Sequence, residues 1–168
     1  MKSRWLAGAI VAGLVFGACG DDDGGNAALP LVGDVAPAVD ALERELGDAP
    51  QYYEIRATPL SVTLWVSADQ GHRAIPYVWA DGELADAGSA QVVESGFTFA
   101  ATDALGFDAD EILDEVADEL DSPLTQFSIV GTEAGAPHYS VTAQSDRGGE
   151  IDIQLAADGT PLEAVPVD

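Results

Sequence analysis

An internal duplication is the feature of this sequence that most constrains its fold. Two segments with an apolar stripe, residues 35–46 and 112–120, are each followed by three strand-like runs in the same order. The paired runs are 53–55 with 127–129, 61–63 with 140–142, and 79–82 with 156–159. The spacing between partners changes by only a few residues, and such changes fall in turns, where insertions cost little. This shared order predicts a helix-strand-strand-strand unit that occurs twice.

Both predicted helices are apolar on one side and acidic on the other. The stripe consists of Val35, Val39, Leu42 and Leu46 in the first helix, and of Ile112, Leu113, Val116, Ala117 and Leu120 in the second. Asp34 and Asp108 stand where an N-cap is expected, and Pro123 follows the second helix. We therefore expect each helix to bury its stripe against a sheet.

The predicted strands alternate between apolar and polar residues. Ile151, Ile153 and Leu155 point to one face, as a half-buried antiparallel strand requires. Asp-Gly pairs at 81–82 and 158–159 are hairpin turn signals, and prolines at 161 and 166 favour an edge strand or a tail for the last run. The predicted class is α+β, with one repeat over 34–102 and the other over 103–168.

The N-terminus has the pattern of an export signal. Lys2 and Arg4 precede an apolar stretch of about eleven residues, which suits a secretory signal and is shorter than the ~20 residues needed to span a bilayer. The run Val15-Phe16-Gly17-Ala18-Cys19 resembles the lipobox of bacterial lipoproteins, with Phe16 where that family usually has Leu. The resemblance implies a signal peptide at 1–18, an acylated Cys19 that holds the chain on a membrane lipid, and a tether over 19–33. An ordinary secretory signal with an incidental thiol is the alternative.

The charge of the chain restricts its partners. All 30 acidic residues follow Cys19, whereas four cations do, namely Arg44, Arg56, Arg73 and Arg147. Such a surface repels phosphate backbones and anionic headgroups, so nucleic-acid binding is excluded and the body should stand off the membrane. This acidity is typical of a protein exposed to a salty or divalent-rich exterior, where counter-ions screen the repulsion.

A second resemblance involves the C-terminal half. Its segments 139–142, 150–153 and 158–162 are similar to the PepSY-type module, and tandem units of this kind also occur in the β-lactamase-inhibitor-like fold. The resemblance implies an extracytoplasmic, non-enzymatic interaction or inhibitor module. The two helices here lack the alanine-rich pairing of PepSY units, so no binding residue is carried over from that family.

The sequence predicts no catalytic centre, metal site or cofactor. Cys19 is used by the anchor, and no nucleophile elbow is present. His72 and His138 fall in different repeats, whereas a metal site needs three or four converging ligands. The aspartates at 21–23 and the acidic face of the second helix, from Asp108 to Asp121, lack the ligand spacing of a calcium loop. A solvated acidic surface is the simpler interpretation, and diffuse divalent binding to that face is left open.

One sheet surface in the first repeat is a candidate binding face. Alternation predicts apolar residues on both sides of the strands near 62–66 and 75–79, although a helix covers one side only. The uncovered residues must pack on the other repeat, on the Phe97–Phe99 segment, or on a partner. The candidate face consists of Trp65, Tyr77, Trp79, Arg56 and Arg73.

These observations favour a lipid-anchored extracytoplasmic protein, on the periplasmic side of an outer membrane or on the cell surface. We expect a non-catalytic binding, interaction or inhibitor-like module, whose partner is an envelope protein, a peptide or a glycan. The alternatives are an extracytoplasmic hydrolase that uses two converging carboxylates and a small-ligand carrier with a hollow between helix and sheet.

Overall fold

The protein is an α+β chain, as the sequence predicts, and it is built on one large antiparallel sheet. The computed structural model describes residues 29–94, 96–106, 113, 116–117, 120, 122–144, 148–156 and 159–167. The predicted signal peptide, Cys19, most of the tether and the acidic face of the second helix lie outside the described residues. No helix among the described residues is long and apolar enough to cross a membrane.

The first half begins with a helix and continues with short and long strands. Its elements are η1 (Val32–Asp34), α1 (Val35–Leu46), β1 (Gln51–Ala57), β2 (Val62–Ala68), η2 (Asp69–Gly71), β3 (Arg73–Ala80), β4 (Glu83–Leu84), β5 (Gln91–Val92), β6 (Phe99–Ala100) and α2 (Ala101–Ala104). In the second half, Leu113, Val116, Ala117 and Leu120 are helical. They are followed by β7 (Leu124–Val130), β8 (His138–Gln144), β9 (Glu150–Leu155) and β10 (Pro161–Val167).

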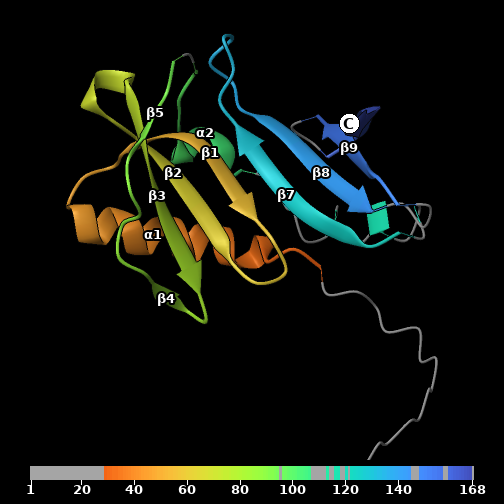
Figure 1. Ribbon diagram of the computed structural model, residues 1–168, viewed down its shortest axis with the longest axis horizontal. Coiled ribbons are helices and arrows are strands. Elements are labelled where there is room, and N and C mark those ends of the chain that lie inside the picture. Colours follow the sequence, from red (N-terminus) through yellow and green to blue (C-terminus); the bar gives the residue numbers. More distant parts are fainter. Residues whose placement is uncertain are drawn as a thin grey trace, which may run out of the picture.

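The two halves contribute to one continuous sheet. Its order is β10-β9-β8-β7-β1-β2-β3-β4, with β5 paired to β3 and β6 paired to β1. The first strands of the two halves, β1 and β7, therefore meet at the centre, and the later strands of each half follow outward in chain order (Figure 1). Ile55 lies opposite Ile129 in this central ladder.

The ladders align the two halves differently from the sequence matches. Ile55 pairs with Leu64 on β2, and Ile129 pairs with Tyr139 on β8, so Leu64 occupies the position that Tyr139 has in the other half. The predicted match of 61–63 with 140–142 is thus displaced along the strand. The reason is that the turn between β7 and β8 is longer than the turn between β1 and β2.

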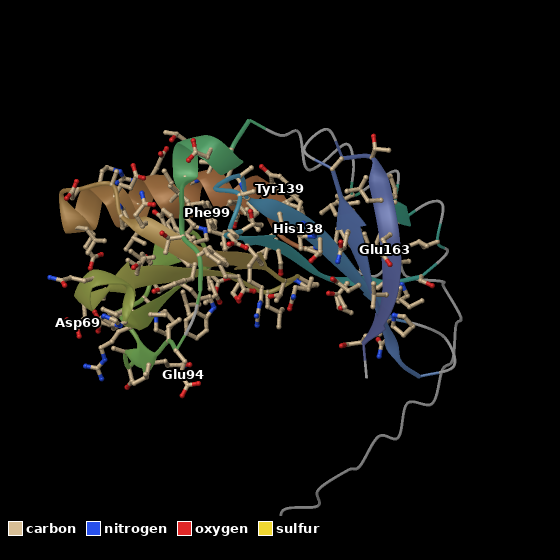
Figure 2. The ribbon with its side chains drawn as sticks, turned by 90° about the horizontal axis from the view of Figure 1, so that it is seen from above. Asp69, Glu94, Phe99, His138, Tyr139 and Glu163 are labelled. Carbon is tan, nitrogen blue, oxygen red and sulfur yellow. The ribbon has the colours of Figure 1, made fainter. Side chains whose placement is uncertain are left out.

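The main core lies between the sheet and the helices on one of its faces. Figure 2 shows α1 and α2 on one side of the sheet, and Glu94 on the other. α1 buries Val35, Ala38, Val39 and Leu42, whereas Leu46, at its end, is 42% exposed. The sheet contributes Tyr52, Ile55, Leu64, Phe127 and Val141 among others, and the second helix contributes Leu113 and Val116. We call the sheet face away from α1 the open face.

Both ends of α1 are determined by nearby side chains and backbone. Asp34 is at the N-cap, as predicted, but its side chain makes no capping hydrogen bond. Instead its Oδ2 accepts a hydrogen bond from Nε1 of Trp79, at 3.3 Å. At the other end Gly47 has φ +71°, which glycine adopts without strain, and its N–H donates to the carbonyl of Glu43.

A bulge in β1 breaks the alternation of its side chains. The register shifts between Tyr52, which lies opposite Val66, and Glu54, which lies opposite Trp65. Tyr52 and Ile55 are both fully buried in the core, although three positions separate them. A regular strand would place them on opposite faces, so the extra residue of the bulge lets Tyr53 and Glu54 both reach the open face.

One predicted turn and the predicted edge strand agree with the sequence signals, whereas Asp158 of the second Asp-Gly pair lies outside the described residues. β3 and β4 form a hairpin through Asp81 and Gly82, which both have positive φ. β10, with Pro161 and Pro166, is an edge strand paired only to β9, as the prolines predict.

Candidate functional site

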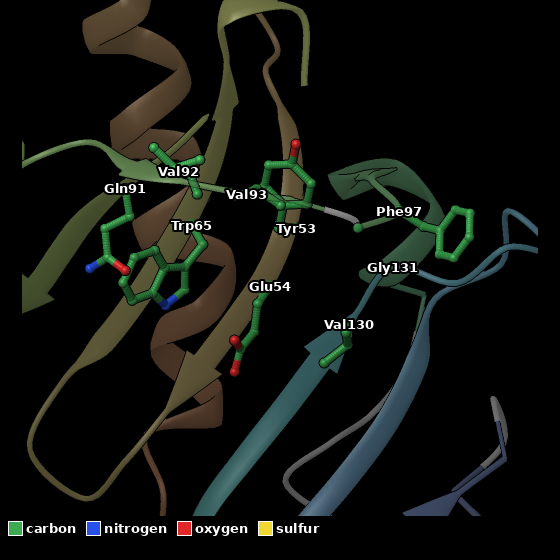
Figure 3. Close-up of a pocket in the computed structure, with 11 residues that line it drawn as sticks. Tyr53, Glu54, Trp65, Gln91, Val92, Val93, Phe97, Val130 and Gly131 are labelled. Atoms are coloured by element: carbon green, nitrogen blue, oxygen red, sulfur yellow. The ribbon is translucent and has the colours of Figure 1, made fainter. Parts of the chain in front are cut away.

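A groove of about 380 Å³ lies on the open face of the sheet, over the end of the first half. We call it the open-face groove (Figure 3). It is lined by Tyr53, Glu54, Trp65, Ala74, Gln91, Val92, Val93, Gly96, Phe97, Val130 and Gly131. These residues come from β1, β2, β3, β5 and β7 and from the segment 93–98, so both halves of the chain contribute to the groove.

The floor of the groove results from the β1 bulge. Because the bulge brings Tyr53 and Glu54 to the open face together, both line the groove beside Trp65, the cross-strand partner of Glu54. Trp65 in turn lies opposite Pro76 on β3. The hydroxyl of Tyr53 donates a hydrogen bond to the carbonyl of Gly71, which holds its ring in place.

One wall of the groove is formed by residues 93–94 and 96–98, which lie over the open face between β5 and β6 and which we call the crossing segment. The N–H of Val93 donates to the carbonyl of His72, at 3.0 Å. A Cβ on Gly96 would come within 3.0 Å of the Tyr53 ring, and one on Gly131 would lie 2.2 Å from the carbonyl oxygen of Phe97. The crossing segment therefore rests directly on β1 and on the end of β7. At Gly131 a Cβ would clash with backbone, so glycine is required there, whereas at Gly96 the Tyr53 ring would have to shift by only a few tenths of an ångström.

Large apolar side chains stand exposed around the groove. Val92 is 74% exposed, Phe97 is 51% exposed and Val130 is 39% exposed. They come from β5, the crossing segment and β7, and all three line the groove together with Trp65. An apolar patch assembled from separate elements is typical of an interaction surface rather than of scattered surface residues.

Two polar groups face this apolar surface. Oε1 of Glu54 accepts a hydrogen bond from Nε of Arg56 at 2.8 Å and lies 2.7 Å from Nη2 of the same guanidinium. Nε1 of Trp65 is buried and has no hydrogen-bond partner within the described part of the chain. An indole N–H is a donor only, so a bound group that brings an acceptor would satisfy it.

The structure divides the predicted candidate face between the two sides of the sheet. Tyr77 lies opposite Leu64, and Trp79 lies opposite Val62, so both point toward α1. Tyr77 is buried, and Trp79 is bonded to Asp34. The expectation that Tyr77 and Trp79 belong to the surface that carries Trp65 is therefore wrong, because the pairing register puts them on the covered side.

The two predicted arginines have different places. Arg56 is on the open face with Glu54. Arg73 is exposed at the beginning of β3, opposite Val92, and does not line the groove. Of the predicted set, Trp65 lines the groove and Arg56 pairs with a residue that lines it.

Sequence reasoning missed most of the groove. The residues not foreseen include Tyr53, Glu54, Val92, Val93 and Val130. A signal for the first two was present, because Tyr52, Ile55 and Ala57 break a period of two in a way that is typical of a bulge. No local signal pointed to Val92 or Val130, which reach the groove through chain crossing and strand pairing.

Other candidate sites are weaker. Among the described residues, no group of three or more His, Cys, Asp or Glu side chains is placed to hold a metal ion. His138 begins β8 and His72 precedes β3, far from each other in the sheet order. A smaller hollow of about 250 Å³ is lined by Val116, Leu120, Ile153, Pro161, Leu162, Glu163 and Ala164. It is smaller than the roughly 300 Å³ at which small-molecule pockets usually begin.

The comparisons with known proteins bear on the fold. No family model and no curated protein matches the chain. Among solved structures, the chain is similar to the crystal structure of a putative lipoprotein from Clostridium difficile 630, with a TM-score of 0.52 and 13% sequence identity. The alignment covers 83% of this chain and 94% of that one. At this identity the likeness is one of fold.

Proposed function

We propose that this chain is a membrane-anchored extracytoplasmic lipoprotein whose folded body is a non-catalytic binding module. The observation that carries the binding role is the open-face groove, which exposed apolar side chains line together with Trp65, whose buried indole N–H has no partner in the described part of the chain. The anchor is Cys19, acylated after removal of residues 1–18, which would hold the body on the periplasmic side of an outer membrane or on the cell surface.

Two independent points support the anchor. The segment 15–19 resembles a lipobox and follows a signal-like stretch. A protein described as a putative lipoprotein has a similar fold over 94% of its own chain. The acidic body would stand off from anionic headgroups, so its contact with the membrane would be made through the acyl chains.

The chemistry of the groove supports binding over hydrolysis. A glycosidase-type hydrolase needs two carboxylates that flank the substrate, whereas Glu54 is the one carboxylate among the residues that line the groove, and it is engaged by Arg56. A ligand carrier would need a hollow between helix and sheet, whereas the described apolar side chains of α1 and of the sheet pack into one hydrophobic core there. The surface chemistry is that of a protein or peptide contact.

We further propose that the two halves are copies of one αβββ unit, similar to PepSY-type and β-lactamase-inhibitor-like repeats. The sheet order supports this, because the strands of each half run outward from a central β1–β7 pair. The position of Ile55 opposite Ile129, its partner in the sequence match of 53–55 with 127–129, is expected of two copies related by a two-fold axis.

The anchor is tested by expressing the full-length chain in a bacterium and fractionating the cells. We expect the wild-type protein in the membrane fraction, with an acylated N-terminal peptide at Cys19 in the mass spectrum. Cys19→Ala should remove the acyl group and release the protein from the membrane. Leu60→Ala, which changes a residue that is 83% exposed in the turn after β1, is the matched control and should stay on the membrane.

Two results would contradict the anchor. One is an unmodified Cys19 thiol in the mature protein, and the other is equal membrane association of the wild-type and Cys19→Ala proteins. Neither result would affect the groove, whose test is separate.

A further inference from the structure

We infer that the open-face groove binds an extended segment of a partner protein in which a large apolar side chain is flanked by lysine or arginine. This inference rests on the proposed binding role and names the class of partner. Three features of the groove carry it: its apolar walls, its unpaired N–H donor and its charge.

The walls are suited to one large apolar side chain. Val92, Phe97 and Val130 are exposed to 74%, 51% and 39%, and they line the groove with Trp65. A volume of about 380 Å³ accommodates a phenylalanine-sized group together with part of its backbone. Branched aliphatic walls favour such a group over a sugar ring, whose hydroxyls would find few partners on Val92, Val93 and Val130.

The donor is suited to a peptide carbonyl. Nε1 of Trp65 is buried beside the groove and has no hydrogen-bond partner among the residues that the structure describes, whereas Nε1 of Trp79, on the opposite face, is bonded to Asp34. When the side chains that cover Nε1 of Trp65 shift on binding, a backbone carbonyl of the bound segment would accept from it and satisfy a buried group that is otherwise costly to leave unpaired. An extended segment presents such carbonyls next to its side chains.

The charge favours a cationic segment. Arg56 contacts Glu54 only through Oε1, and no hydrogen bond or ion pair to Oε2 is found among the described residues. Oε2 can therefore accept from a cation of the bound segment. Glu94 is exposed next to Val93 on the crossing segment. After Cys19 the chain has 30 carboxylates and four arginines, so its field attracts a basic partner and repels an acidic one.

The test is fluorine NMR of the full-length protein in detergent micelles, with fluorotryptophan in place of tryptophan. The chain has three tryptophans, Trp5, Trp65 and Trp79, and the Trp65→Phe and Trp79→Phe variants assign the signals of the two in the folded body. The probe is the capped pentapeptide Gly-Lys-Phe-Lys-Gly at low salt. We expect a saturable shift of the Trp65 signal and a fixed Trp79 signal, because Trp79 is on the covered face of the sheet.

Matched peptides and variants test each feature. Replacing Phe of the peptide by Ser, or both Lys by Glu, should weaken binding by about tenfold or more. The double variant Val92→Ala and Phe97→Ala should do the same, because both side chains are exposed and their truncation leaves the core intact. Leu60→Ala, another exposed apolar residue that lies outside the groove, should leave the affinity unchanged.

Three outcomes would overturn the inference. The first is a Trp65 signal that the peptide does not move, and the second is equal binding of the Lys and Glu peptides. The third is a Trp65 signal that moves with chitotetraose and not with the peptide, which would show a glycan site. This last outcome leaves the binding module standing, and none of the three touches the anchor, so failure of this inference is distinguishable from failure of the proposed function.

Discussion

At the scale of single residues, two buried tyrosines have opposite roles in stability. Tyr52 is fully buried on β1, and its hydroxyl has no hydrogen-bond partner within the described residues. Tyr139 is buried on β8, and its hydroxyl donates to the carbonyl of Ala104 at 3.2 Å. Each ring contacts a phenylalanine, Phe99 for Tyr52 at 6.0 Å and Phe127 for Tyr139 at 6.4 Å between ring centroids.

We predict that Tyr52→Phe and Tyr139→Phe change stability in opposite directions. Tyr52→Phe keeps the ring and removes a buried unsatisfied hydroxyl, so the free energy of unfolding at pH 7 should rise by about 1 kcal/mol. Tyr139→Phe removes a hydrogen bond, and this free energy should fall by about 1 kcal/mol. Urea unfolding of the two variants beside the wild type measures both, and a loss of stability in Tyr52→Phe would contradict the prediction.

The effect of Tyr52 on stability should also depend on pH, which gives a second test of its burial. Burial, and to a smaller extent the Glu43 carboxylate, raise the pKa of Tyr52 above its ordinary value of 10.0. The unfolded chain therefore loses this proton first as the pH rises. The contribution of Tyr52 to stability is complete below pH 10 and is lost progressively above it. Stability measured from pH 9 to 12 should fall less steeply in Tyr52→Phe than in the wild type.

A second residue-scale prediction concerns the wall of the groove. Gly131→Ala places a Cβ 2.2 Å from the carbonyl oxygen of Phe97, so the backbone of the crossing segment must move. We expect a loss of about 1–3 kcal/mol, as for overpacked sites, and weaker binding in the groove. Gly106→Ala is the control, because a Cβ there meets nothing within 4 Å. Equal thermal midpoints for the two variants would show that the crossing segment does not rest on Gly131.

At the scale of elements, α1 is bound to the sheet through the apolar side chains of one of its faces. Leu42 is fully buried against the sheet, and Leu46, one turn later, is 42% exposed. We predict that Leu42→Ala lowers the free energy of unfolding by about 2–5 kcal/mol, because it leaves a cavity in the core. Leu46→Ala should cost much less. Chemical denaturation of both variants is the measurement, and similar losses would mean that α1 is not packed as described.

Also at this scale, the elements differ in how well the sequence predicts them. α1 and the hairpin at Asp81–Gly82 follow from local patterns, and the structure confirms both. The orientation of β3 could not be predicted from its sequence. Alternation shows which residues share a face of the strand, but it does not show which of the two faces α1 covers. The sequence therefore predicts Tyr77 and Trp79 on the same face as Trp65, whereas the pairing of β3 with β2 places them on the face that α1 covers.

At the scale of the whole molecule, charge is the dominant feature. The described residues contain one ion pair, Arg56 with Glu54, while the chain after Cys19 has 30 carboxylates against four arginines. The folded state therefore suffers a self-repulsion that salt screens, since the Debye length falls from about 10 Å at 0.1 M to about 3 Å at 1 M.

We predict that the thermal midpoint of unfolding rises by several degrees between 0.1 M and 1 M NaCl. Each kcal/mol gained in the free energy of unfolding corresponds to a rise of about 2–4 °C. Near pH 4, where many carboxylates are protonated, the same change in salt should have a smaller effect. Scanning calorimetry at both pH values checks this. A midpoint that does not depend on salt at pH 7 would mean that repulsion among the carboxylates does not limit stability.

The sequence by itself determined the features that depend on near neighbours along the chain. These are the α+β class, the stripe of α1, the hairpin turn at Asp81–Gly82 and the edge position of β10. The tertiary structure alone decided the open-face groove, because its walls come from β1, β2, β5, β7 and the crossing segment. Periodicity is a local property of a strand, whereas burial is decided by the strand pairing and the helix that covers one face. For that reason Trp65 and Trp79, only 14 positions apart in the sequence, lie on opposite sides of the sheet.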